Sequence, residues 1–132
     1  MVKGLAPQAE CWVSFQVRSD GARLADGTPL DEAVAWATRE ETVVAVGVNC
    51  VAPDVVDRAL PVLRACTSKP LVACPNAGDL YDPVAKSWRA GEGRSGAAAL
   101  APSWIASGAR LIGGCCRTRP AQIRELARAV DA

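Results

Sequence analysis

Four features are missing from this 132-residue sequence: a long apolar run, a basic cluster, a leader-like start and histidine. No stretch approaches the ~18 apolar residues that a membrane-spanning helix needs, and residues 1–7 lack the apolar core of a signal peptide. The 15 basic and 14 acidic residues are interspersed, so no strip of positive charge is available for nucleic acid. We therefore expect a cytoplasmic protein with neither a membrane nor a nucleic acid as its partner.

Cysteine, in contrast, is well represented. Six are present, and in a chain of this length they do not resemble the disulfide framework of a small secreted domain. In a reducing compartment such thiols serve more often in catalysis or metal binding than in bridges. Three of them, Cys50, Cys115 and Cys116, follow apolar runs at points where strands would end. The other three are expected to pack as small apolar side chains.

Apolar runs typical of strands alternate along the chain with amphipathic stretches typical of helices. We predict strands over 12–17, 43–49, 70–74 and 109–113, and helices over 28–40, 55–65, 96–107 and 118–130. Thr28 is expected to cap the first of these helices, with Pro29 in its first turn. Buried strands that alternate with helices indicate an α/β fold with a parallel sheet, which is either doubly wound or closed into a barrel.

Residues 79–95 are predicted to form a long loop, and such loops in compact domains are commonly functional or mobile. Its end contains a G-x-G-x-x-G pattern over residues 91–96, as found in dinucleotide-binding proteins. No buried strand precedes the pattern, and no acidic residue lies about 20 residues beyond it. We therefore interpret it as a flexible loop that leads into a helix.

In both architectures the functional side chains gather at the carboxyl ends of the strands. Cys50, Asn76 and the pair Cys115 and Cys116 all fall at that edge. Neighbouring side chains on a regular strand point to opposite faces, so the backbone must turn if both cysteines are to reach one ion. Two glycines, 113 and 114, supply the freedom for that turn. This pattern predicts a thiolate metal site, and the alternative is two buried thiols that only pack.

Three motifs carry a family resemblance: Val48-Asn49-Cys50, Cys74-Pro75-Asn76-Ala77-Gly78 and Gly113-Gly114-Cys115-Cys116. With these motifs in this order, the chain resembles the zinc-dependent homocysteine S-methyltransferase family over nearly its whole length. Residues 26–30 and 81–88 are in addition similar to the branch that uses S-methylmethionine or S-adenosylmethionine as methyl donor.

The resemblance implies that Cys50, Cys115 and Cys116 are the three ligands of Zn²⁺, with which the absence of histidine is compatible. Homocysteine would bind zinc as a thiolate in the open fourth position. Its sulfur would then take a methyl group from a cationic sulfonium donor, giving methionine. Asn49 and Asn76 are candidates for orienting groups around the sulfur, although an asparagine at a strand end more often caps a turn.

The family fold implied by the resemblance is a TIM barrel of eight βα units, and the four units here look like its last four. Residues 1–132 would then be a single partial domain, and the residues that hold the amino and carboxylate groups of homocysteine would belong to the absent half. Free sheet edges favour association with a complementary N-terminal half or with a second copy. Two alternatives remain: a non-catalytic zinc-binding or assembly module, and a doubly wound domain with inert cysteines.

Overall fold

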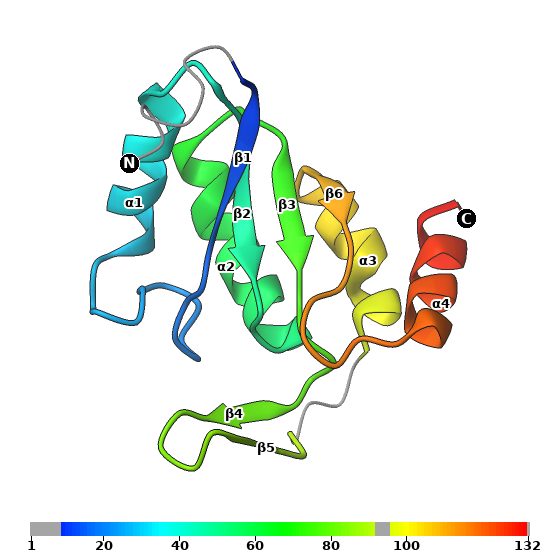
Figure 1. The fold of residues 1–132 in the computed structure, drawn as a ribbon. Coiled ribbons are helices and arrows are strands. Elements are labelled where there is room, and N and C mark those ends of the chain that lie inside the picture. The colour runs from blue at the N-terminus through cyan, green and yellow to red at the C-terminus, as the bar shows by residue number, and fades with distance from the viewer. Residues whose placement is uncertain (1–8, 92–95, 132) are drawn as a thin grey trace.

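The computed structural model describes residues 9–91 and 96–131, and it contains a four-stranded parallel sheet, four helices and a small hairpin (Figure 1). Four residues of the glycine-rich pattern, 92–95, lie outside the described residues. The elements in chain order are β1 (Cys11–Phe15), α1 (Leu30–Arg39), β2 (Val43–Asn49), α2 (Pro53–Cys66), β3 (Leu71–Cys74), β4 (Leu80–Asp82), β5 (Ser87–Arg89), α3 (Ala97–Ala106), β6 (Ala109–Ile112) and α4 (Pro120–Asp131).

The main sheet has the strand order β1-β2-β3-β6, and all its neighbours are parallel. Within this sheet, each strand lies beside the strand that follows it in sequence, and a helix connects the two. The β4–β5 hairpin is inserted between β3 and α3 and does not join the sheet. This confirms the predicted alternation of strands and helices around a parallel sheet. Within the described residues the strand order shows no reversal, and β1 and β6 form the two free edges of the sheet.

The hydrophobic core lies between one face of the sheet and the helices α1, α2 and α3, which cover that face (Figure 1). Alternate strand residues point into it because successive side chains in a strand point to opposite faces. Fully buried members come from both layers: Val46, Val48, Leu71, Val34, Leu60, Leu63 and Trp104. The opposite face of the sheet therefore carries the remaining residues, among them Ser14, Gly47 and Asn49.

Most differences from the predicted elements are shifts of their ends. The first strand stops at Phe15, and Val17 takes part only in an isolated bridge with Leu24. The first helix begins at Leu30, and no side chain caps it, so the predicted role of Thr28 as its cap is wrong. Pro29 occupies the cap position instead, and the Thr28 amide donates to the carboxylate of Asp26.

The predicted loop between β3 and α3 contains an antiparallel hairpin of β4 and β5. Tyr81 and Trp88 face each other across it with ring centroids 5.1 Å apart. A cross-strand aromatic pair of this kind stabilises a hairpin by about 0.5 kcal/mol or more. Three-residue strands are too short to produce a clear alternation in sequence, which is why the pattern indicated only a loop.

The last helix, α4, packs against α3 and leaves much of its apolar face open. Leu126 is buried, whereas Ile123 and Val130 are each 43% exposed. Together with Ile112 and Gly113 of the β6 edge, these residues line a groove. Among the described residues, the helices are all too short or too polar to cross a membrane.

Candidate metal centre

The three predicted ligand cysteines come together at the carboxyl edge of the sheet. The Sγ atoms of Cys50, Cys115 and Cys116 all lie within 4.8 Å of one another. Cys50 Sγ is 3.2 Å from Cys116 Sγ, and Cys115 Sγ is 4.0 Å from Cys116 Sγ. Two of the thiols are half-buried and Cys116 is exposed, so the cluster is open to solvent on one side. No other group of three potential metal-binding side chains lies among residues 9–91 and 96–131.

The segment after β3 holds the two cysteine loops together by backbone hydrogen bonds on both of its sides. Toward β2, the Cys50 amide donates to the Cys74 carbonyl (2.9 Å), and the Asn76 amide donates to the Val51 carbonyl (2.9 Å). Toward β6, the Cys115 amide donates to the Pro75 carbonyl (2.7 Å), and the Ala77 amide donates to the Cys116 carbonyl (3.1 Å). The sheet ladder thus continues beyond the strands, which is why cysteines 66 residues apart converge.

The backbone has positive φ values at Cys50 and Arg117 rather than at the predicted glycines, 113 and 114. Cys50 has φ 55° and Arg117 has φ 64°, both in the left-handed region that side chains with a Cβ rarely adopt. Gly113 and Gly114 are absent from the residues with positive φ. Gly114 is needed for a close approach instead, because a Cβ there would lie 2.4 Å from Thr118 Cγ2. The turn that lets both adjacent cysteines reach one point is completed at Arg117.

Asn49 is the last residue of β2 and directly precedes Cys50. The side-chain oxygen Oδ1 of Asn49 accepts a hydrogen bond of 3.0 Å from the hydroxyl of Ser14 on β1. The sequence alone does not indicate Ser14, because its proximity to Asn49 depends on the pairing of β1 with β2 and on the face that both residues share.

Asn76 lies elsewhere: it is 5% exposed and its contacts are to the backbone rather than to a sulfur. Its Nδ2 donates to the Asp79 carbonyl (3.1 Å) and lies 3.5 Å from the Cys50 carbonyl, while its Oδ1 accepts from the Gly78 amide (2.8 Å). The described contacts therefore agree with a turn-capping role, and any effect of Asn76 on the cluster is transmitted through the Cys50 loop.

Cys50 and Cys115 differ in how readily their thiols ionise. Burial and, after it, hydrogen bonds with Cys116 and Cys115 raise the pKa of Cys50 to about 12. Burial also opposes ionisation of Cys115, but hydrogen bonds from Cys50, from Cys116 and from Asn49 outweigh it and lower the pKa of that thiol. A second or third thiolate needs a cation to offset the repulsion between like charges.

The donor set and its geometry fit Zn²⁺. Four sulfurs at about 2.3 Å around a tetrahedral zinc ion are about 3.8 Å apart, and the separations of 3.2 and 4.0 Å lie on either side of that value. Three protein ligands with an open fourth position are typical of catalytic zinc, whereas structural sites are closed by four. The cluster therefore has the composition of a reactive zinc centre.

The remaining cysteines lie outside the cluster. Cys74 is the nearest of them: it pairs in register with Asn49, and a Cβ on Gly113 would lie 3.5 Å from its sulfur. Burial, and then the charge of Cys115, raise the pKa of this thiol. Cys11 and Cys66 pack against the hydrophobic core, as expected.

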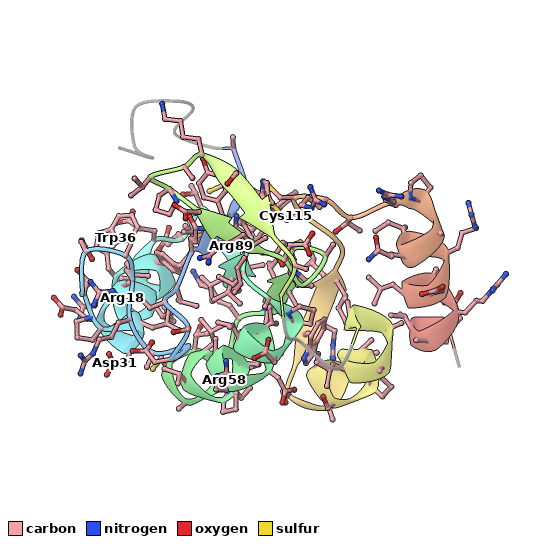
Figure 2. All side chains as sticks on the ribbon, turned by 90° about the horizontal axis from the view of Figure 1, so that it is seen from below. Arg18, Asp31, Trp36, Arg58, Arg89 and Cys115 are labelled. Atoms are coloured by element: carbon pink, nitrogen blue, oxygen red, sulfur yellow. The ribbon has the colours of Figure 1, made fainter. Side chains whose placement is uncertain are left out.

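The β4–β5 hairpin is fastened to the same end of the sheet. Asp79, which immediately precedes β4, forms an ion pair with Arg117. Figure 2 looks onto this end of the molecule and shows Cys115 there, with the hairpin on the side away from α2 and α3. The hairpin base and the cysteine loop are thus held together by a charge pair in addition to the backbone hydrogen bonds.

Comparison with known proteins identifies the relatives of this chain. The sequence profile of the family described as homocysteine S-methyltransferase matches residues 1–130. The chain belongs to the homocysteine S-methyltransferase family. It is 48% identical over 121 residues to the homocysteine S-methyltransferase of Escherichia coli strain K12, covering 91% of this chain and 39% of that protein. The homocysteine S-methyltransferase YbgG of Bacillus subtilis strain 168 is 38% identical over 121 residues, covering 92% of this chain and 38% of that protein.

A solved structure of the family agrees with the fold. The metallated form of the homocysteine methyltransferase MmuM from Escherichia coli superposes with a TM-score of 0.73 and 43% sequence identity, covering 92% of this chain and 36% of that chain. The present chain therefore spans less than two fifths of the length of these family members.

Proposed function

We propose that this chain carries the zinc-binding, sulfur-activating part of a homocysteine S-methyltransferase. The proposed reaction moves a methyl group from S-methylmethionine or S-adenosylmethionine to homocysteine and gives methionine. The convergence of Cys50, Cys115 and Cys116 at one open point on the strand edge is the observation that supports this proposal most strongly. Membership of the family supplies the reaction class.

In this proposal the three cysteines hold Zn²⁺ as thiolates. When bound, zinc lowers the pKa of a further thiol, that of homocysteine, so that its sulfur reacts as a thiolate. The homocysteine sulfur attacks the methyl carbon of the donor, a new S–C bond forms and the bond to the donor sulfur breaks. The electron pair of the broken bond stays on the donor sulfur, which changes from a cationic sulfonium to a neutral thioether. No proton needs to move during this step, so a general base is not required.

The fold supports a further proposal, that residues 1–132 are one partial domain forming half of a TIM barrel. A doubly wound sheet reverses its strand order at a switch point, whereas β1, β2, β3 and β6 follow one another in sequence. The helices α1, α2 and α3 cover only one face of the sheet, as in a barrel wall (Figure 1). Both free edges and the apolar face of α4 would be covered by four further βα units. We propose that those units also hold the amino and carboxylate groups of homocysteine.

The experiment combines this chain with the part it does not cover. Co-expression with the N-terminal part of the Escherichia coli relative supplies the complementary half, and methionine formation is measured with homocysteine and each donor in turn. We expect zinc-dependent methionine formation by the pair, and loss of it in Cys116→Ser while Cys66→Ser remains active. Assembly of a folded, zinc-loaded pair without methionine formation from either donor would contradict the proposed reaction.

A second candidate is a non-catalytic zinc-binding or assembly module. It is favoured by the coverage of the relatives, since only 39% of the Escherichia coli protein is represented in the chain. Binding of one equivalent of zinc by the chain alone, with no heat of homocysteine binding in calorimetry with or without the complementary half, would support this candidate over the enzyme.

A further inference from the structure

The hydrophobic core is open at both edges of the sheet. At the β1 edge, Val13 and Phe15 face the helices and are only partly buried against the core. At the β6 edge, Ile112 is partly buried, and Ile123 and Val130 of α4 are each 43% exposed. The strands β2 and β3 between these edges carry fully buried residues on the same face. The layer between the sheet and the helices is therefore closed in its middle and open at its two ends.

Each open end has what the other end lacks. On the β6 side, α4 lies beyond the last strand (Figure 1), and apolar side chains line the groove between them. On the β1 side, the strand has no further helix over its outer edge among the described residues. There Trp36 is 47% exposed, on the side of α1 away from α2 (Figure 2). One end is thus a helix without a strand beneath it, and the other is a strand without a helix above it.

The charges of the two ends are also complementary. Residues 30–41, which contain α1, include four acidic residues and one basic residue, whereas residues 117–128, which contain most of α4, include four basic residues and one acidic residue. Of the basic residues, Arg117 is paired with Asp79. Arg124 and Arg128 are exposed one turn apart on α4, and Glu32 is exposed on α1. Opposite charges on two surfaces steer their association and disfavour other arrangements.

The open face of the sheet has room for side chains from an opposite wall. Trp12 lies on this face, is 60% exposed, and has Ala45 as its register partner. Beside Ser14 on the same face is Gly47, which has no side chain. The interior of a closed βα barrel is filled by side chains rather than by water. Small residues beside Trp12 leave space for a second large ring, which a symmetric copy of this sheet would supply.

We propose that a second copy of this chain closes the sheet into a barrel with twofold symmetry, in which β6 of each copy pairs with β1 of the other. All four strands are parallel, and a twofold axis along the strands keeps their direction, so both new strand pairs are parallel as well. Four strands from each copy give the eight of a TIM barrel, and a closed ring leaves no free edge.

In this dimer the apolar side chains of α4 cover those of β1 in the second copy, and Trp36 packs against the outer side of α4. The carboxyl ends of β6 and of the neighbouring β1 meet at one rim, so the loop after β1 of the second copy lies beside the exposed Cys116. The inference rests on the proposed half barrel, because the complementary half of a longer relative would compete for the same two edges.

The test measures association of the reduced chain by sedimentation equilibrium over a range of concentrations. We expect one associated species with twice the 13.7 kDa mass of a single chain. Trp36→Lys places a charge at the β1 side of the interface and Val130→Lys places one at the β6 side, so each should weaken association by at least about tenfold. Val84→Lys, at a 92% exposed position of the hairpin, is the matched control and should leave association unchanged.

Amide hydrogen exchange locates the interface without any substitution, so it remains informative if a variant does not fold. Edge strands have backbone amides without a partner, and pairing with another strand protects them. We expect protection to increase with protein concentration in both β1 and β6. Protection of only one of these edges would mean that like edges meet, and this would overturn the inference.

Three other results would also overturn the inference: a monomer at all concentrations, an open series of larger oligomers, or a dimer that only one of the two edge variants weakens. Circular dichroism of each variant checks that the sheet is intact. A chain that is monomeric alone but forms an active pair with the complementary half would overturn the inference and leave the proposed function standing. A dimer with the expected dependence on both edges, together with a zinc-loaded pair that forms no methionine, would support the inference and contradict the proposed reaction.

Discussion

Replacement of Asn76 by alanine should loosen the connection between the Cys50 loop and the hairpin base. The side chain is 5% exposed and makes two good hydrogen bonds, from the Gly78 amide at 2.8 Å and to the Asp79 carbonyl at 3.1 Å. The 3.5 Å contact with the Cys50 carbonyl is at the limit of a hydrogen bond and adds little. Each good bond contributes about 1 kcal/mol, and each partner left buried without water costs about 1–3 kcal/mol.

Because the cost of an unsatisfied partner already contains the lost bond, the two partners together give Asn76→Ala a loss of about 2–6 kcal/mol in the free energy of unfolding. With a urea dependence of about 2 kcal/mol per molar, the middle of the range for small domains, the unfolding midpoint should fall by roughly 1–3 M. The assay is urea unfolding of the reduced, metal-free chain followed by circular dichroism. Asn76→Asp keeps the volume and the acceptor but loses the donor, so it should also be destabilised. Val84→Ala, at a 92% exposed position, is the matched control and should change stability by less than about 0.5 kcal/mol.

An unchanged midpoint in Asn76→Ala would refute the reasoning, because it would mean that these contacts do not hold the turn. If Asn76→Ala is destabilised but Asn76→Asp has normal stability, the hydrogen bond that Asn76 Nδ2 donates to the Asp79 carbonyl does not contribute to stability as we expect. The first result would also remove the basis for describing Asn76 as a link between the cluster and the hairpin.

Two further predictions concern the sheet and the hairpin. Gly47→Ala places a Cβ 1.9 Å from the Val72 carbonyl oxygen, so we expect loss of the cooperative urea transition; a normal transition would contradict the close approach of β2 and β3. The amides of Ala85 and Val84 donate to Asp82 and lower the pKa of its carboxyl below 3.8. This turn should therefore be stabilised above pH 3.8 and lose that contribution as the pH falls through the lowered pKa. Near-ultraviolet circular dichroism of the Tyr81–Trp88 pair measures it; Asp82→Asn should abolish the acid transition, and an identical transition in both proteins would contradict the assignment.

The parts of the fold that follow from local pattern were predictable from the sequence. The apolar runs before Cys50 and Cys115 identified the strands β2 and β6, and their carboxyl ends placed the cysteines at a common edge. The hairpin of β4 and β5 was not predictable in the same way, because its strands have only three residues each.

The details of the site depend on contacts between strands, which local sequence does not specify. Ser14 became visible only when the register between β1 and β2 was known. Asn76 was a candidate orienting group, with turn capping as the more common role of a strand-end asparagine, and its amide is occupied by backbone groups. The positive φ values of Cys50 and Arg117 also have no sequence signal, since neither is a residue type that favours the left-handed region.

The central claim is that Cys50, Cys115 and Cys116 hold zinc and leave one position for a substrate thiol. X-ray absorption at the zinc edge of the zinc-loaded chain tests it most directly. We expect three sulfur neighbours at about 2.3 Å, two in Cys116→Ser, three in Cys66→Ser, and a fourth sulfur when homocysteine is added together with the complementary half. A zinc ion with fewer than three sulfur neighbours in the original chain, or a sulfur count unchanged by Cys116→Ser, would contradict it.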